Sequence, residues 1–538
     1  MLPSAHVDTF ARDNLPPAAQ WPVFLLDRPE LRYPDRLNAA AALLDATVAA
    51  GHGTRIALRS DTATLDYRSL QTQVDRICRV LVEDLGLVPG NRVLLRGANN
   101  PTMAACWLAV VKAGLVAVAT MPMLRAAELV PVIEKAQVTA ALCDVRLKDE
   151  LLAAQARCPV LRQVLWFNDA DGADSLEARC ATKADGFAAC DTALDDVALI
   201  AFTSGTTGQP KGTMHFHRDV IAMCDLFPRS VLKPGADDVF AGTPPLAFTF
   251  GLGGMLCFPM RVGASTLLLE RSTPESLLEA IARHRATILF TAPTFYRQMA
   301  MRAKEFDLSS LKQAVSAGEA LPDATRQLWK QATGIELIDG IGATEMIHIF
   351  ISSPPEAVRR GAIGKVLPGY EARIVDDAMN PLPPGGIGRL AVRGPTGCRY
   401  LADPRQANYV RDGWNLTGDT FSMDADGYFI YQARSDDMIV SAGYNIAGPE
   451  VEAALLTHDA VAEAGVTGVP DDERGMIVKA FVVLKPGHVG DDAMVRALQE
   501  HVKATIAPYK YPRAIAFRDA LPRTETGKLQ RFRLRETG

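Results

Sequence analysis

The residues best equipped for chemistry lie in one stretch, residues 203–212 (TSGTTGQPKG), which combines three glycines, four hydroxyl side chains and one lysine. Glycines allow the backbone to turn so that successive N–H groups converge on one point. The hydroxyls donate further hydrogen bonds and Lys211 adds a positive charge. Such a loop is suited to holding an anion, and phosphate groups are the expected ligands.

The neighbouring residues suggest how this loop is positioned. Residues 197–202 (VALIAF) predict a buried strand, and the apolar spacing from His217 onward predicts the start of a helix. A strand, a glycine-rich loop and a helix form a common phosphate-binding arrangement. A Walker loop is excluded, because Pro210 precedes the lysine and Gly212 follows it. A surface loop without a ligand is the alternative, but flexible linkers rarely show this residue order.

Composition restricts the class of protein. The chain has 538 residues, which is too many for a single hydrophobic core, so we expect several domains. With 48% apolar residues, 22% charged residues and a mean hydropathy of +0.05, it has the composition of an ordinary globular protein. A net charge of −5 and a pI near 6.0 argue against general binding of nucleic acid or of anionic membranes.

Targeting and metal signals are weak. The N-terminus lacks a basic segment followed by an apolar one, so we expect no signal peptide and a cytoplasmic protein. The most apolar stretch, residues 104–120, contains Lys112 and Gly114 and predicts a buried helix and strand. The nine cysteines form no CxxC pair and are expected to be reduced thiols. His215 and His217 lack further ligands, so we expect structural roles for both.

Helix and strand patterns alternate in the first part of the chain, which predicts a parallel sheet covered by helices. Similar units follow at 276–291 and 322–339. The expected helices begin at 67, 101 and 126, and the expected strands are 92–96, 115–120 and 139–143.

The pattern changes after about residue 369. Strands expected at 371–376, 388–394 and 428–432 indicate a β-rich subdomain at about 370–434. The last hundred residues predict two helices and three strands with their own core. We therefore expect an α/β protein with a large domain of parallel-sheet and β-rich subdomains at 1–434 and a small, mobile α+β domain at 435–538.

The loop at 203–212 closely resembles the phosphate loop of the acyl-adenylate-forming enzymes, a family of acyl-CoA synthetases, peptide-synthetase adenylation domains and luciferases. Further motifs follow in the family's order between about residues 65 and 531. The resemblance implies that this loop binds ATP and that Thr206 also lies near Mg²⁺. The loop residues with this expected role are Thr203, Ser204, Gly205, Thr206, Thr207, Gly208 and Lys211.

Three more motifs resemble the family's nucleotide site. Residues 339–345 (DGIGATE) imply that Glu345 holds Mg²⁺ beside Thr344, a role suited to a single carboxylate. Residues 316–321 (SAGEAL) resemble the segment that flanks adenine, and 416–420 (LTGDT) the one whose aspartate accepts both ribose hydroxyls. The remaining nucleotide-binding residues implied are Gly318, Glu319, Asp339, Gly340, Asp419 and Arg434. The family often has an aromatic residue where this chain has Ile341.

The motifs of the C-terminal region resemble a domain that moves. The resemblance implies a hinge at Asp436, and an approach of Gly443 to the acyl group during thioester formation. Ala442 stands where some members have glycine. Residues 522–529 (PRTETGKL) resemble the motif of the catalytic lysine, which is Lys528 here. A solvated surface lysine is the alternative.

The resemblance implies a two-step reaction. A carboxylate attacks the α-phosphate of ATP and forms an acyl-adenylate and pyrophosphate, and a thiol then attacks the adenylate. The first step brings anions together, so it requires the positive charge of Mg²⁺, Lys528 and the loop amides. Rotation about Asp436 would present Lys528 in the first step and Gly443 in the second, and a closing domain also excludes water.

Two segments, 245–253 and 346–350, resemble the aryl-CoA ligase branch, especially its 2-aminobenzoate and benzoate ligases. The resemblance implies an aryl pocket made of Thr249, Phe250, Gly342, His348 and Ile349. Phe250 and Ile349 would stack on a flat ring, and the Thr249 hydroxyl could accept a hydrogen bond from an ortho amine. A core role for His348 is the alternative.

The sequence therefore predicts an enzyme that uses ATP, Mg²⁺ and CoA to activate an aryl acid. We expect 2-aminobenzoate first and benzoate second, and loading of a carrier protein as a further alternative. Lys510 and Arg513 are candidates for the 3′-phosphate of CoA, and a homodimer is left open. A kinase pattern is absent. A regulator without catalysis would be expected to lack Lys528 or Glu345.

Overall fold

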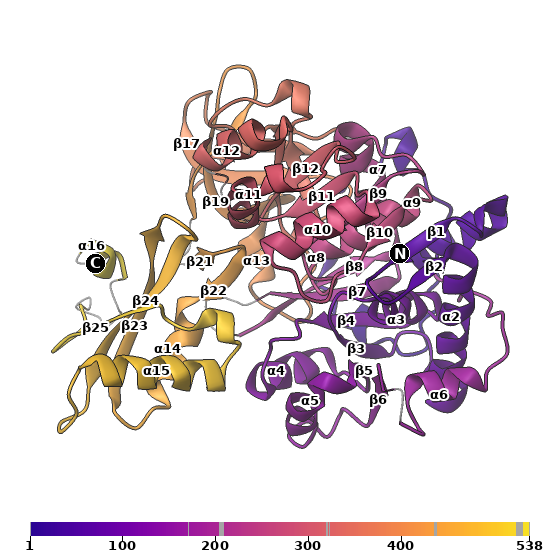
Figure 1. Ribbon diagram of the computed structural model, residues 1–538, viewed down its shortest axis with the longest axis horizontal. Coiled ribbons are helices and arrows are strands. Elements are labelled where there is room, and N and C mark those ends of the chain that lie inside the picture. Colours follow the sequence, from indigo (N-terminus) through magenta and orange to yellow (C-terminus); the bar gives the residue numbers. More distant parts are fainter. Residues whose placement is uncertain are drawn as a thin grey trace.

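The computed structural model describes residues 2–169, 172–203, 209–318, 321, 323–434, 438–522 and 531–536. The chain forms a large domain and, from residue 438, a small domain that lies beside it (Figure 1). Within the described residues, every helix is too short or too polar to cross a membrane.

A six-stranded sheet organises the first part of the large domain. Five of its strands are parallel, and β8 pairs antiparallel with β7 at the edge. In spatial order the strands are β6 (Gln163–Phe167), β5 (Ala140–Asp144), β3 (Arg92–Arg96), β4 (Val116–Thr120), β7 (Val197–Thr203) and β8 (Lys211–Phe216). The helices of this region are α1 (Phe10–Asp13), α2 (Tyr67–Arg79), α3 (Pro101–Lys112), α4 (Ala126–Ala136), α5 (Lys148–Gln155) and α6 (Leu176–Ala181).

A nine-stranded sheet organises the second part. Its central strands are parallel, and β2, β14 and β15 join antiparallel at the two ends. In spatial order the strands are β15 (Lys365–Val366), β14 (Ile349–Ser352), β13 (Leu337–Gly342), β12 (Gln313–Ser316), β11 (Ile288–Thr291), β9 (Val239–Gly242), β10 (Ser265–Leu267), β1 (Ile56–Arg59) and β2 (Thr64–Asp66). Its helices are α7 (His217–Phe227), α8 (Thr249–Leu252), α9 (Phe258–Arg261), α10 (Pro274–His284), α11 (Pro293–Ala300) and α12 (Asp323–Thr333).

An antiparallel sheet forms the β-rich subdomain. It contains β16 (Glu371–Val375), β17 (Ile387–Arg393), β18 (Val410–Arg411), β19 (Trp414–Met423) and β20 (Phe429–Arg434), with α13 (Gln406–Tyr409) beside it. The long β19 was not expected, because Gly418 and Asp419 resemble a turn. Gly418 has a φ of +80°, and the register of β19 shifts near this point, so the strand passes through an irregularity instead of turning back.

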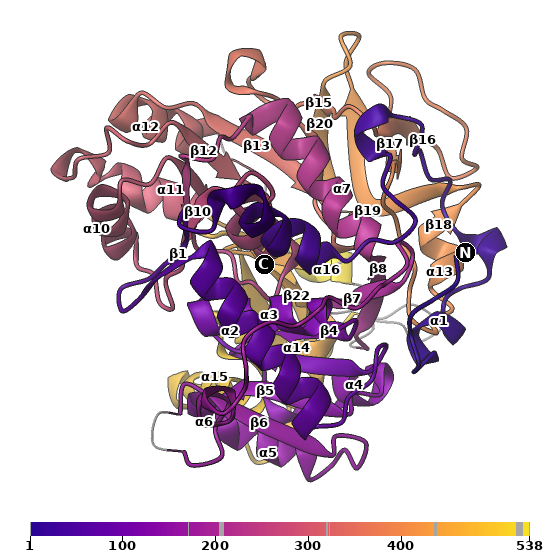
Figure 2. The same cartoon turned by 90° about the vertical axis from the view of Figure 1, so that its right-hand side faces the viewer.

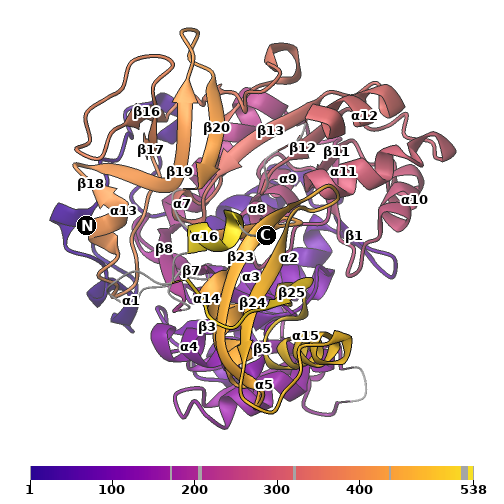
Figure 3. The ribbon, with the colours of Figure 1, turned by 90° about the vertical axis from the view of Figure 1, so that its left-hand side faces the viewer.

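The small domain has its own core. It contains β21 (Met438–Ser441), β22 (Tyr444–Ala447), β23 (Val461–Asp471), β24 (Gly475–Leu484), β25 (Ala514–Phe517), α14 (Gly448–Leu456), α15 (Asp492–Thr505) and α16 (Arg531–Glu536). Figure 3 shows the β23–β24 hairpin in front of the large domain. Its buried apolar side chains, among them Val451, Val466 and Val502, pack together, as the expected α+β unit requires. The predicted fold class is thus confirmed.

The strand predicted at 197–202 and the helix start predicted at His217 are confirmed as β7 and α7, but a strand that was not predicted, β8, lies between the phosphate loop and the helix. Lys211 begins β8 and pairs with Thr203 across the loop, so the loop joins two antiparallel strands. The helix α7 starts only at His217 and leads away from the end of β8 (Figure 2). Five of the six residues of β8 are buried, and a side chain at Gly212 would come within 2.9 Å of Ile200 and Phe202, so glycine lets the two strands pack closely. No helix N-terminus therefore follows this loop directly.

Candidate active site

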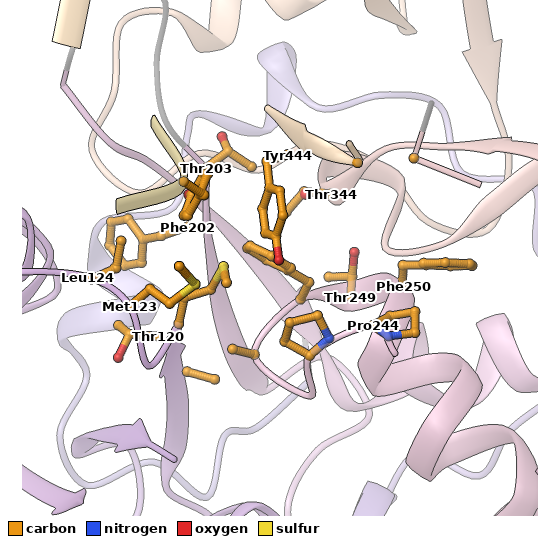
Figure 4. A pocket seen from close by; sticks show the side chains of 18 of the residues that line it. Thr120, Met123, Leu124, Phe202, Thr203, Pro244, Thr249, Phe250, Thr344 and Tyr444 are labelled. Carbon is orange, nitrogen blue, oxygen red and sulfur yellow. The ribbon is translucent and has the colours of Figure 1, made fainter. Parts of the chain in front are cut away.

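A cavity of about 1500 Å³ lies between the two domains and is lined by both. Figure 4 shows Thr249 and Phe250 on one side of it, Leu124 and Phe202 on the other, and Tyr444 between them. The cavity brings together most of the described residues that the sequence nominated. Those in its wall are Thr203, Lys211, Thr249, Phe250, Gly318, Gly342, Thr344, Glu345, His348, Ile349, Asp419, Gly443 and Lys510.

The remaining nominated residues fall into two groups. Arg434 ends β20, and Asp339, Gly340 and Arg513 are described but do not contribute to the cavity wall. The roles expected for the others stay predictions, because they lie outside the described residues. These are Ser204, Gly205, Thr206, Thr207, Gly208, Glu319, Asp436 and Lys528.

Asp339 and Gly340 shape β13. The Asp339 carboxylate is buried and accepts a hydrogen bond of 3.0 Å from the Gly340 N–H. Burial raises the pKa of Asp339 to about 7, against the opposing charge of Arg326. A side chain at Gly340 would come within 2.8 Å of Ile349, so glycine here lets β14 pack closely.

The polar part of the cavity centres on Glu345, in the 3₁₀ turn Thr344–Met346. The Tyr400 hydroxyl donates to Glu345 Oε1, and Lys211 Nζ lies 3.9 Å from the same oxygen. Among the described residues, no three His, Cys, Asp or Glu side chains cluster as metal ligands. One carboxylate beside a loop that is expected to bind phosphate is nevertheless a donor set that fits Mg²⁺, which takes its other ligands from phosphate and water.

A buried network holds this turn in place. His215 Nε2 lies 2.7 Å from the Thr344 carbonyl oxygen, and His215 Nδ1 lies 3.8 Å from Asp219 Oδ2. Asp219 also accepts a hydrogen bond from the Arg399 guanidinium. Burial raises the pKa of Asp219, but the charges of Arg399 and Arg218 and the hydrogen bond with His215 together outweigh this effect and hold the pKa below its ordinary value. The network links α7 to the residues that face the cavity.

Sequence reasoning did not find Tyr400, Arg399 or Asp219. Met214 N–H donates to the Arg399 carbonyl at 2.8 Å, so the segment that carries Tyr400 lies against β8. A charged residue within an apolar segment could have indicated such a network. A charge in that setting is expected to be buried, and buried charges are almost always paired.

The opposite end of the cavity is aromatic and uncharged. Thr249 is the first residue of α8 and is buried, next to Phe250. The His348 ring lies among three phenylalanine rings, at centroid distances of 5.7 Å from Phe227, 5.6 Å from Phe250 and 4.5 Å from Phe258. Burial lowers the pKa of His348 to about 3, so its imidazole is neutral near pH 7. This end therefore favours an apolar, flat group.

A strained residue joins the polar and aromatic ends. Ile347 has a φ of +66° and a ψ of −36°, which is rare for a β-branched side chain and costs about 1–3 kcal/mol. It turns the chain between Glu345 and His348, so that both face one cavity. Gly342 supports this turn, since a side chain there would lie 2.8 Å from the His348 backbone. The strained residue therefore lies between the polar end and the aromatic end of the cavity.

The small domain contributes the turn between β21 and β22. Ala442 and Gly443 have φ values of +48° and +80°, so alanine adopts the left-handed conformation where some family members have glycine. Gly443 Cα lies 4.0 Å from the place that a Cβ on Gly318 would occupy. The next residue, Tyr444, stacks on Tyr509 with ring centroids 4.2 Å apart. The structure thus brings Gly443 to the nucleotide motif.

The two residues nominated for CoA have other surroundings in this domain arrangement. Lys510 is buried, and its Nζ lies 2.5 Å from Glu128 Oε1 and 2.6 Å from Glu450 Oε1. Both partners are carboxylates, so its charge is already matched. The Arg513 guanidinium lies 4.8 Å from the centroid of the Tyr511 ring. Neither arrangement supports a phosphate contact as it stands, and both roles stay predictions.

Comparison with known proteins agrees with this geometry. The family model described as "AMP-binding enzyme" matches residues 45–400, and "AMP-binding enzyme C-terminal domain" matches residues 450–528. The chain is 36% identical to a benzoate–CoA ligase of Thauera aromatica, over 94% of this chain and 97% of the relative.

Two solved structures are also similar. The anthranilate CoA ligase AuaEII in complex with anthranoyl-AMP has a TM-score of 0.74 and 32% identity, over 95% of this chain and 99% of that one. The amide bond synthetase McbA from Marinactinospora thermotolerans has a TM-score of 0.83 and 28% identity, over 93% and 99%. Together with the cavity, these matches establish that the chain belongs to the family of AMP-binding enzymes.

Proposed function

We propose that this AMP-forming acid–thiol ligase activates 2-aminobenzoate as its acyl-adenylate and transfers the acyl group to CoA, with benzoate or another substituted benzoate as the alternative acid. The observation that carries the proposal is the uncharged aromatic end of the cavity, with a threonine hydroxyl beside it.

The aromatic end favours a flat ring for energetic reasons. Phe250 and the neutral His348 offer apolar surface, and burying a benzene ring there removes apolar area from water. Thr249 distinguishes between acids, because its hydroxyl can accept a hydrogen bond from an amine ortho to the carboxylate. The names of the relatives, a benzoate–CoA ligase and an anthranilate CoA ligase, support an aryl acid of this kind.

The polar end provides for the nucleotide. Lys211 lines the cavity and would add a positive charge where the carboxylate attacks the α-phosphate, and Asp419 could accept hydrogen bonds from the ribose hydroxyls. Glu345 would hold Mg²⁺, which would neutralise the charge of the phosphates when bound. Lys528 is proposed to add a second positive charge during adenylate formation. These charges reduce the repulsion between the two anions.

The second step uses the face that the small domain presents in this structure. Gly443 has no side chain, so the turn at 442–444 leaves room for a thiol to approach the acyl carbon. The thiolate would attack the acyl carbon of the adenylate, and AMP would leave with the electron pair of the broken acyl–oxygen bond. Tyr444 lines the cavity and would shield the mixed anhydride from water on that side.

Pyrophosphate release with a panel of aryl and fatty acids, measured with and without CoA, tests the proposal. We expect 2-aminobenzoate to give the highest kcat/KM and turnover to require CoA. Higher kcat/KM for benzoate would exclude the role given to Thr249 but keep the reaction. Turnover that needs an amine or a carrier protein instead of CoA would exclude the proposed acceptor. No turnover with any aryl acid would exclude the substrate class.

A further inference from the structure

A carboxylate of the large domain holds the small domain in its present place. Glu128 lies in the first turn of α4, and its Oε2 accepts hydrogen bonds from the Arg125 N–H at 2.9 Å and from the Ala507 N–H at 2.8 Å. Its Oε1 accepts from Lys510 Nζ at 2.5 Å. Ala507 and Lys510 belong to the small domain, so two of these three hydrogen bonds join the two domains through one carboxylate. Figure 1 shows α4 next to the small domain.

The contact is dry. The side chains of Glu128 and Lys510 are only 8% and 4% exposed, although they belong to different domains. Lys510 also contacts Glu450 within the small domain. Transferring charges out of water is expensive, so a buried ion pair gives little net attraction but is strongly selective, since either charge left alone would be penalised. Such a pair is therefore suited to selecting one domain arrangement among several.

The contact continues to the cavity. Tyr509 precedes Lys510 in the 3₁₀ turn Pro508–Lys510, and its ring stacks on Tyr444 at an interplanar angle of 28°. Tyr444 follows Gly443 directly. Packed side chains therefore connect Glu128 to the turn at residues 442–444, which faces the proposed acyl site.

We propose that Glu128 is a positioning residue for acyl transfer to the thiol: it holds the small domain in the arrangement that presents Gly443 to the adenylate. The inference rests on the proposed function, because it needs the thiol-transfer step. It goes further because it assigns a role in only one of the two half-reactions to Glu128, a residue that the sequence analysis did not identify. Adenylate formation, for which the small domain is proposed to rotate, does not use this contact.

Separate measurement of the two half-reactions tests the assignment. Glu128→Gln keeps the shape of the side chain and removes its charge. We expect ATP–pyrophosphate exchange with 2-aminobenzoate to change less than about twofold, and transfer from preformed adenylate to CoA to slow by about tenfold or more. Glu134→Gln is the matched control, because Glu134 lies exposed on the same helix, and both rates should stay at the wild-type level.

A double variant shows whether Glu128 acts through Lys510. If it does, Glu128→Gln combined with Lys510→Met slows transfer no more than the stronger single variant, whereas independent roles would multiply the two losses. Unchanged transfer in Glu128→Gln, an equal loss in both half-reactions, or multiplying losses would each overturn the assignment.

Hydrogen exchange of the unliganded protein provides a readout that needs no substrate. We expect Glu128→Gln to accelerate exchange about fivefold or more in peptides covering residues 442–447 and 505–511, with β13 and β14 unaffected. Unchanged exchange at 442–447 and 505–511 would overturn the docking role. If the wild-type enzyme accepts no aryl acid, the proposed substrate fails, and this measurement still decides whether Glu128 holds the domain.

Discussion

Two buried ion pairs distinguish the two halves of this site. Arg399 and Asp219 lie within the large domain, and both side chains are completely inaccessible to water. Lys510 and Glu128 are almost as buried, but they join two domains. The first pair is fixed by strand pairing, since Met214 and Leu401 hold the segment around Arg399 against β8. The second pair is fixed only as long as the domains stay docked.

This difference indicates a division of labour. Under the proposed function, the large domain carries groups that both half-reactions would need, namely the aryl pocket and the Glu345 turn, and buried contacts within that domain secure them. Under the same proposal, the small domain carries groups that one half-reaction would need, and contacts between the two domains secure them. Changes in the large-domain network should therefore affect stability or both steps, and changes in the small domain only one step.

The largest effect is expected for Arg399→Met. The substitution leaves Asp219 buried without its partner, and this loss typically costs about 3–5 kcal/mol. Urea denaturation followed by intrinsic fluorescence should show a clearly lower unfolding midpoint. Glu128→Gln, whose partner can rehydrate when the domains separate, should leave the midpoint of the large domain nearly unchanged. The opposite ranking would refute the distinction between the two ion pairs.

Lys528→Ala should produce the largest effect on a single step. Removing a positive charge from an anionic transition state typically slows a reaction by about 100-fold to 1000-fold. We expect a loss of this size in ATP–pyrophosphate exchange, while transfer from preformed adenylate to CoA stays near the wild-type rate. Lys485→Ala, at an exposed lysine of the same domain, serves as the control. Equal losses in the two half-reactions would exclude the role assigned to Lys528.

Tyr400→Phe tests a hydrogen bond within the large domain. It removes the hydroxyl that donates to Glu345, and a hydrogen bond to a charged group contributes about 1.5–3 kcal/mol. Since Tyr400 orients the carboxylate expected to hold Mg²⁺, the concentration of Mg²⁺ for half-maximal pyrophosphate exchange should rise about tenfold or more. Tyr428→Phe loses a hydrogen bond to Ala357 outside the cavity wall and should leave this concentration unchanged.

The division between the two halves also explains what the sequence could predict. Alternating helix and strand patterns predicted the parallel sheets, and short motifs gathered Lys211, Glu345 and Gly443, all of which line one cavity. Each motif is a local string, so it is visible in one segment of the chain. The extent of β8 was missed because a short strand starting with Lys-Gly carries little hydrophobic signal.

The supporting residues could not be found in the same way. Asp219 and Arg399 are 180 positions apart, and Glu128 and Lys510 are 382 apart. An apolar neighbourhood in the sequence can indicate that a charge such as Arg399 is buried, but only the fold shows which residue it pairs with. Ile347 was missed for a different reason, because nothing in an isoleucine residue signals a positive φ.

A smaller effect is expected for Thr249→Val, which replaces a hydroxyl by a methyl group of similar size. If the hydroxyl accepts a hydrogen bond from the ortho amine, its loss costs about 1 kcal/mol. The value of kcat/KM for 2-aminobenzoate should fall about fivefold, benzoate should change less than about twofold, and Thr249→Ser should restore most of the loss. Equal losses for the two acids would place the specificity elsewhere in the pocket.

The smallest expected effect concerns His348, whose protonation state should not change over the accessible pH range. Because burial holds the pKa of His348 near 3, its ring should stay neutral between pH 8 and pH 5, and its Cε1–H resonance should not shift in NMR spectra over this range. His348→Gln identifies the resonance by its disappearance.

The depressed pKa also has a consequence for stability. Below about pH 6.5 the unfolded chain binds a proton at this histidine and the folded chain does not, so folding should weaken as the pH falls, by up to about 1.4 kcal/mol per pH unit for this group. His348→Gln should remove that part of the slope. A resonance that titrates near pH 6.5 would mean that the aryl end of the cavity is wet, and that the contrast between a fixed, dry large-domain site and a separable domain contact is weaker than the packing of Phe227, Phe250 and Phe258 indicates.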